Sequence, residues 1–260
     1  MKFNRCREKT QQLLTVGIVI CSVLSSAAQM GNAQPQRQII STNELLAPHA
    51  AQVAAHHARE ALDRGRYDEA RKHIAQALEI YPVFAVALHL RGILNLREKH
   101  LDEACADFQQ AIQFDPNFAA PYLALGAAYN RLGHFQDAIV PLGRAAVILP
   151  NAWTVQYEMA VAYLGAGKYE AALGAISRAV EINPDEPNNR SAVFYTKARV
   201  LLELKDYPAA KAAFVQSISQ DPKGPFASLS QEMLERISAR SNEGAITSVK
   251  DVRENLPHTR

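Results

Sequence analysis

Five prolines that recur at a nearly fixed spacing constrain the fold of this chain more than any other feature. They are Pro82, Pro116, Pro150, Pro184 and Pro222, with separations of 34, 34, 34 and 38 residues. A proline locks φ, lacks a backbone donor and disfavours helical backbone at the preceding residue, so each is expected to end a helix. A fixed period of this size is typical of helical solenoids, whose repeats bury their apolar faces against each other. The sequence therefore predicts an all-α array of short units.

Alignment on these prolines gives five units with columns of matching residue size. The units are residues 51–84, 85–118, 119–152, 153–186 and 191–224. Small residues fill position 8 (Ala58, Gly92, Gly126, Ala160, Ala198), position 20 (Ala70, Ala104, Ala138, Ala172, Ala210) and position 27 (Ala77, Ala111, Ala145, Ala179, Ser217). Large residues fill position 17 (Tyr67, Leu101, Phe135, Tyr169, Tyr207) and position 24 (Ile74, Phe108, Leu142, Ile176, Phe214). Small side chains let neighbouring helices approach closely, so each unit is predicted to be a tightly packed helix pair.

This pattern resembles the tetratricopeptide repeat family, which has small residues at positions 8, 20 and 27 and a proline at position 32. All five units match, over about residues 51–222. The resemblance implies an all-α fold: a right-handed superhelical solenoid of helix-turn-helix repeats with a concave groove. His57, Arg91 and Lys197 depart from the family because they stand at position 7, where it prefers an apolar residue.

The turns and the C-terminal part complete the expected solenoid, which spans residues 44–240. Glycine is expected to adopt the left-handed conformation at the end of the first helix in three units, and Lys99 and Lys205 replace it in the other two. An insertion at residues 185–190 lengthens one loop, and Asn188 or Asn189 is expected to cap the helix that follows. Residues 225–240 are predicted to form a capping helix. Residues 241–260 show no periodicity and are predicted to be a loose tail.

The first 33 residues have the pattern of an export signal. Four basic residues surround one acidic residue, an apolar run follows at residues 13–24, and small residues come next. Cleavage after Ala28 or after Ala33 would leave a periplasmic or extracellular protein. The alternative is an uncleaved N-terminal membrane anchor, although the apolar run is shorter than the ~20 residues that a spanning helix needs. Residues 34–43 are polar and are expected to be a tether.

Charge and cysteine content exclude some function classes. Outside the leader the chain has 24 basic and 25 acidic residues, which provides no basic surplus for nucleic acid. Only Cys105 remains there, so an exported chain has no internal disulfide, and Cys105 is expected to be a core residue.

No catalytic signature is present. The chain lacks a phosphate-binding glycine loop, a Gly-x-Ser-x-Gly elbow and a His-Glu-x-x-His helix. His56, His57, His73 and His89 have no Cys or carboxylate cluster at ligand spacing, so surface histidines are favoured over a metal site. We therefore expect no enzyme, no catalytic or metal-binding residues and no cofactor.

In the tetratricopeptide family, positions 2, 5, 9 and 12 of each first helix line the concave groove. Members that clamp a C-terminal carboxylate use Lys and Asn at positions 5 and 9, a pairing absent from these helices. The groove positions are apolar and aromatic in the middle, which suits an extended or helical partner segment, unless several of these side chains simply pack on the adjacent repeat. The expected partner-binding residues are Arg59, His89, Tyr157, Tyr195 and Arg199.

The resemblance thus implies a non-catalytic protein–protein interaction module that binds protein or peptide segments outside the cytoplasm. Nucleic acid and small-molecule substrates are not expected, and a membrane only if the leader is retained. The alternative is an accessory subunit that assembles a cell-envelope or secretion complex through its convex face and the loop at residues 185–190. Deleting that loop would distinguish the two functions.

Overall fold

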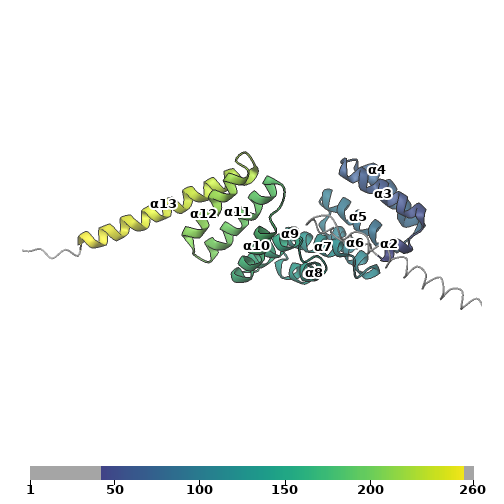
Figure 1. Ribbon diagram of the computed structural model, residues 1–260, viewed down its shortest axis with the longest axis horizontal. Coiled ribbons are helices and arrows are strands. Elements are labelled where there is room, and N and C mark those ends of the chain that lie inside the picture. Colours follow the sequence, from purple (N-terminus) through teal and green to yellow (C-terminus); the bar gives the residue numbers. More distant parts are fainter. Residues whose placement is uncertain (1–41, 255–260) are drawn as a thin grey trace, which may run out of the picture. The chain divides into compact units, whose positions relative to one another are not determined.

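The computed structural model describes residues 42–254, and the side chains of residues 43–239, all within one compact unit. Every regular element in this part of the chain is a helix (Figure 1). The first helices of the five units are α3 (His49–Asp63), α5 (Ala85–Arg97), α7 (Ala119–Leu132), α9 (Trp153–Gly165) and α11 (Pro187–Glu203). The second helices are α4 (Tyr67–Ile80), α6 (Leu101–Phe114), α8 (Phe135–Ile148), α10 (Tyr169–Ile182) and α12 (Tyr207–Gln220). A short helix, α2 (Thr42–Leu46), precedes them and a long one, α13 (Pro225–Glu254), follows.

The helices pack in chain order, as Figure 1 shows. Each first helix contacts the second helix of its own unit and the second helix of the unit before it. Successive first helices also contact each other, whereas successive second helices touch only marginally, if at all, in the described part of the chain. The first helices therefore form the inner side of the array and the second helices its outer side. The predicted all-α solenoid of helix pairs is confirmed.

The small-residue columns make this close packing possible. Every residue at positions 20 and 27 of the five units is fully buried. At position 8, a Cβ atom on Gly92 would collide with the ring of Phe108, and one on Gly126 would collide with Leu142. The large residues of position 24 thus occupy the space that the small residues of position 8 leave open. Cys105 is buried as expected.

The turns between the helices of a unit adopt the left-handed conformation in all five repeats. Glycine provides it in three of them, with φ of 69° at Gly65 as an example. Lys99 and Lys205 adopt φ values of 67° and 63°, which a residue with a Cβ atom adopts only at a cost. The left-handed conformation predicted for the glycine turns is confirmed, and the two lysines at the equivalent positions adopt it as well.

Three boundaries differ from expectation. The helix α11 begins at Pro187 with Glu186 as its N-cap, so the prediction that Asn188 or Asn189 caps it is wrong. Proline is favoured in the first turn because its fixed φ suits a helix and its missing donor is not needed there. The helix α13 runs on to Glu254, beyond the expected end at residue 240, because no proline interrupts it before Pro257.

The third boundary is at the N-terminal side, where helix α2 begins at Thr42, inside the expected tether. The leader at residues 1–33, the tether up to residue 41 and the last six residues of the expected tail lie outside the described residues. None of the helices between residues 42 and 254 is long and apolar enough to cross a membrane.

Helix α2 is held to the array by Asn43. The side-chain amide of Asn43 donates to the Val83 carbonyl at 3.0 Å and accepts from the Ala85 backbone nitrogen at 2.8 Å. The backbone nitrogen of Asn43 donates to Asp115 Oδ2 at 3.3 Å. Because Asn43 and Asp115 are both buried, these bonds are shielded from water and fix α2 against the start of α5.

Candidate functional site

The five expected partner-binding residues fall into two groups on the inner helices. Arg59 and His89 lie on α3 and α5, in the first two units. Tyr157 lies on α9, and Tyr195 and Arg199 lie on α11, in the last two units. The central helix α7 separates the two groups along the chain, so they are two local sites.

Tyr157, Tyr195 and Arg199 form the C-terminal site. The guanidinium carbon of Arg199 lies 5.9 Å from the centre of the Tyr195 ring, a cation–π distance. Burial raises the pKa of the Tyr157 hydroxyl, while a hydrogen bond with Thr196 and the charge of Arg199 act in the opposite direction. Residues of α11 thus act directly on Tyr157 of α9, because the side chains of the two helices lie close together.

Aromatic neighbours hold the two tyrosines in place. The Tyr195 ring lies 5.9 Å from that of Phe214 and 5.5 Å from that of Phe226. The Tyr157 ring packs edge-on against Trp153, with ring centres 6.3 Å apart. Both tyrosines stay partly exposed, and Arg199 is exposed and forms no ion pair with any described residue. The site therefore presents two fixed aromatic side chains beside one free positive charge.

Arg59 and His89 make up the N-terminal group. The His89 ring lies 5.5 Å from Phe108 and 5.4 Å from Phe118, and its Nδ1 atom is buried without a hydrogen-bond partner. Burial and, to a smaller extent, the nearby charge of Arg59 together lower the pKa of His89 to about 4. His89 is thus neutral at neutral pH and packs mainly within its own repeat. Arg59 is exposed.

A polar pair between the two sites was missed by sequence reasoning. Asn130 Nδ2 on α7 donates to Glu158 Oε2 at 2.8 Å and to the Glu158 carbonyl at 3.0 Å. Burial raises the pKa of Glu158, whereas the Asn130 hydrogen bond and the charge of Arg131 lower it. Asn130 occupies a groove position, but Glu158 stands at position 6, so the family geometry gave no reason to select it. The pair links the inner helices α7 and α9.

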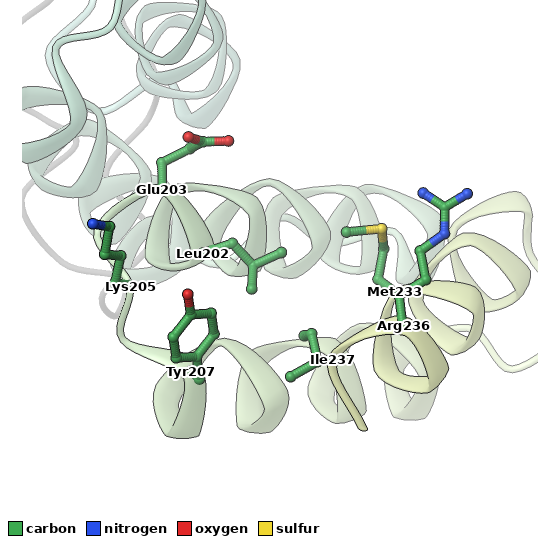
Figure 2. Close-up of a pocket in the computed structure, with 7 residues that line it drawn as sticks. All are labelled: Leu202, Glu203, Lys205, Tyr207, Met233, Arg236 and Ile237. Carbon is green, nitrogen blue, oxygen red and sulfur yellow. The ribbon is translucent and has the colours of Figure 1, made fainter. Parts of the chain in front are cut away.

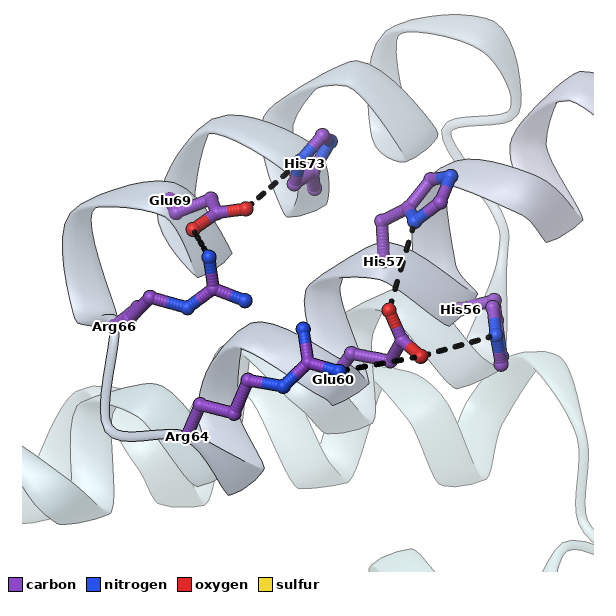
Figure 3. A network of polar contacts seen from close by, with 7 residues as sticks. All are labelled: His56, His57, Glu60, Arg64, Arg66, Glu69 and His73. Atoms are coloured by element: carbon purple, nitrogen blue, oxygen red, sulfur yellow. Dashed lines mark ion pairs between the residues drawn. The ribbon is translucent and has the colours of Figure 1, made fainter.

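The histidines of the first unit form a surface network with two carboxylates and two arginines (Figure 3). His56 Nε2 lies 3.7 Å from Glu60 Oε1, and His57 Nδ1 lies 3.9 Å from Glu60 Oε2. On α4, Arg66 pairs with Glu69 at 2.7 Å, and His73 Nε2 lies 4.0 Å from Glu69 Oε1. Among the residues whose side chains are described, no group of three or more His, Cys, Asp or Glu could hold a metal ion. We interpret these histidines as surface residues. The same expectation is wrong for His89, whose ring is buried against Phe108 and Phe118.

A cleft of about 870 Å³ opens at the C-terminal end of the array, between the α11–α12 turn and α13 (Figure 2). Its lining residues are Leu202, Glu203, Lys205, Tyr207, Met233, Arg236 and Ile237. Arg236 is already paired with Glu232 on its own helix at 2.7 Å. The lining therefore mixes apolar and charged groups that largely neutralise one another, and no single ligand chemistry follows from it.

Comparison with protein families and solved structures identifies the class of this helical array. A family model described as a TPR repeat matches residues 97–133, and two described as tetratricopeptide repeat match residues 147–187 and 191–223. The second and third matches span the helix pairs α9–α10 and α11–α12, and the first spans α6 and α7, which belong to successive units and pack on each other. Helix arrays of this kind serve as protein-interaction scaffolds. The chain is a tetratricopeptide repeat protein, as its sequence predicted. Proteins of this family are generally non-catalytic interaction modules.

Several solved structures share the fold. PilF of Pseudomonas aeruginosa is 18% identical with a TM-score of 0.62, and the match covers 79% of this chain and 92% of that one. MamA (residue 41 to the end) of Desulfovibrio magneticus RS-1 is 17% identical with a TM-score of 0.60, covering 68% and 98%. YrrB, described as a TPR protein with an unusual peptide-binding site, is 18% identical with a TM-score of 0.58, covering 70% and 92%. At these identities the likeness shows the fold alone. A search of curated proteins found no match.

Proposed function

We propose that this chain is an exported, non-catalytic scaffold that holds a segment of a partner protein in its inner groove. The main contact would be the C-terminal site of Tyr157, Tyr195 and Arg199, with Arg59 and His89 as a weaker second contact. The observation that carries the proposal is the exposed Arg199 guanidinium, which lies over the Tyr195 ring and has no ion-pair partner among the described residues.

The chemistry of the C-terminal site suggests the kind of segment that binds there. Two partly exposed tyrosines offer flat apolar surfaces whose rotamers are already fixed by Trp153 and Phe214, so binding costs little side-chain entropy. Arg199 offers a charged donor beside them, which favours a carboxylate on the partner. The expected segment therefore carries an acidic residue next to an apolar one. No nucleic acid, small-molecule substrate or cofactor is part of the proposal.

A site-specific crosslinking experiment tests the groove. A photo-reactive residue in place of Val161, one helical turn after Tyr157 on α9, should trap the bound segment in an extract from the native organism, and mass spectrometry identifies it. The same residue in place of Arg178, on the outer helix α10, is the control. Trapping of the same segments from both positions would contradict binding in the groove.

Substitutions then test the individual residues with the trapped segment as a synthetic peptide. Arg199→Glu, Tyr157→Ala and Tyr195→Ala should each weaken binding by about tenfold or more, because they remove the charge or an aromatic anchor. Arg178→Glu reverses the charge of an exposed arginine on α10, and this variant should bind the peptide as the original chain does. Equal affinity of all four variants, with unchanged circular dichroism melts, would refute the site.

The proposed export rests on the leader pattern of residues 1–33. Mass measurement of the mature N-terminus decides this point. A start at residue 29 or 34 indicates a released protein, whereas an intact N-terminus in the membrane fraction indicates an anchored one.

A further inference from the structure

The outer face of helix α8 carries the two most exposed valines among the described residues. The position of Val147 carries a polar residue on the other second helices (Glu79, Gln113, Glu181, Ser219), and the position of Val140 carries Lys72 or a small residue (Ala106, Gly174, Ala212). On α8 the same face carries Val140, which is 73% exposed, and Val147, which is 72% exposed. The apolar face of α8 is covered by no described part of the chain.

Gly143 lies between these two valines and has no internal reason to be glycine. A Cβ atom built on Gly143 would meet nothing within 4 Å, in contrast to Gly126, where it would collide with Leu142. Glycine inside a helix costs about 0.5–1 kcal/mol relative to alanine, so the fold is less stable for having it there. A glycine on an exposed helix face does allow another helix to approach closely.

A cleft of about 450 Å³ lies directly beside this face. Its floor includes Tyr122, Leu125 and Tyr129 of α7, and its rim includes Asp137, Val140 and Arg144 of α8. Gln109 Nε2 on α6 donates to the Tyr129 hydroxyl at 3.0 Å and fixes the ring at the cleft wall. Pro141 lacks a backbone donor, so the Asp137 carbonyl has no helical hydrogen-bond partner. The cleft therefore has an aromatic and apolar floor with polar and charged residues around it.

The charges on this face are self-complementary. Asp137 and Arg144 are seven residues apart, which places them two turns apart on the same side of α8 with Val140 between them. Both are exposed, and neither pairs with another described residue. In an antiparallel pair of α8 helices whose twofold axis passes between Val140 and Pro141, each Asp137 faces Arg144 of the second copy. An isologous contact uses the same surface of both copies around a twofold axis. An acid and a base at equal distances from that axis therefore meet as two equivalent ion pairs.

We propose that a second copy of this chain docks here, through antiparallel pairing of the two α8 helices. Two ion pairs between Asp137 and Arg144 set the register, the two Val140 side chains meet at the axis, and Gly143 lies within one turn of it and permits close approach. This pairing uses the outer side of the array and leaves the inner groove open. Dimerisation and partner binding are therefore separate properties of the chain.

Sedimentation equilibrium of the purified chain over a wide concentration range tests the pairing. The original chain should show a dimer mass. Asp137→Arg places two arginines opposite each other, and Arg144→Asp two aspartates, so each should raise the dimer dissociation constant by about tenfold or more. The double variant D137R/R144D should dimerise again. An equimolar mixture of the two single variants should form a heterodimer, because both of its ion pairs are attractive.

Matched variants separate the pairing from folding and from other surfaces. Val140→Asp and Gly143→Lys should abolish the dimer, whereas Val215→Asp, at an exposed valine of α12, and Gly174→Lys, at an open glycine of α10, should leave it intact. Circular dichroism checks that each variant folds. A monomer at all concentrations, or a dimer that the charge exchange does not restore, overturns the proposal. A dimer in which Arg199→Glu abolishes peptide binding supports both proposals separately.

Discussion

Leu142 of α8 occupies the space that a side chain at Gly126 of α7 would need. Leu142 is fully buried, so this contact helps to set the distance between the two helices of the central unit. The same relationship joins Gly92 and Phe108 one unit earlier. Glycine at position 8 of these two units is therefore a packing requirement, in contrast to the open glycines of the outer helices.

Gly126→Ala and Gly174→Ala should change stability in opposite directions. At Gly126 the added methyl group collides with Leu142, and overpacking of this kind costs about 1–3 kcal/mol. At Gly174 the methyl group meets no atom within 4 Å, so only the gain in helix propensity of about 0.5–1 kcal/mol remains. Urea denaturation of both variants measures the two values. Destabilisation by Gly174→Ala would contradict the open surroundings of Gly174.

His89 should make the protein less stable in acid. Its pKa is about 4 in the folded chain and 6.5 ordinarily, so between these pH values the unfolded state binds more protons. The free energy of unfolding should therefore fall as pH decreases from about 6.5 to about 4, by up to about 3 kcal/mol. His89→Phe should remove this part of the pH dependence. His49→Gln, at an exposed histidine, is the control and should leave the profile unchanged.

Glu158 should make the protein less stable as pH rises above the ordinary pKa of glutamate. Burial raises its pKa in the folded state, so the folded state holds the proton more tightly than the unfolded state does. The stability associated with this group is present below the ordinary glutamate pKa and is lost as pH rises through the folded value. Glu158→Gln keeps an oxygen for Asn130 to donate to and should flatten the profile. Glu170→Gln on the exposed side of α10 should not, and thermal melts from pH 4 to pH 8 compare the two.

Lys99→Gly and Lys205→Gly should each stabilise the protein. Both lysines adopt positive φ, where an L-residue other than glycine is disfavoured by about 1–2 kcal/mol. Part of this gain is offset because glycine also increases the entropy of the unfolded chain, so about 1 kcal/mol is expected. Lys211→Gly, within α12, should destabilise instead. The midpoint of denaturant unfolding, compared between variants of equal m-value, measures the change in the free energy of unfolding.

The repeat architecture was predictable because small and large residues alternate in register with the prolines. Alanines that recur at one repeat position, such as Ala70, Ala104 and Ala138, indicate that two helices pack closely there, and all three are fully buried. The lysine turns were predictable for the same reason, because their position in the repeat fixes their backbone conformation.

The candidate site was predictable only in outline. Family geometry identified the inner positions, and it placed Tyr157, Tyr195 and Arg199 on helices that prove to be neighbours. It could not show that His89 is enclosed by Phe108 and Phe118, because that depends on the rings of two other segments. It also missed Glu158, whose contact with Asn130 arises between units and has no fixed spacing in the sequence. The extent of α13 was missed because a helix without apolar periodicity gives no pattern.

The anchoring of α2 by Asn43 has a mechanical consequence. A chain pulled at its N-terminal end transmits the load first to this residue, whose three hydrogen bonds attach α2 to Val83, Ala85 and Asp115. The helix pairs of the first two units therefore carry no load at the start of extension. We expect the bonds of Asn43 to break first, as a small separate force event before any helix pair opens. Single-molecule force spectroscopy should lose that event in Asn43→Ala, while the later unfolding steps keep their forces.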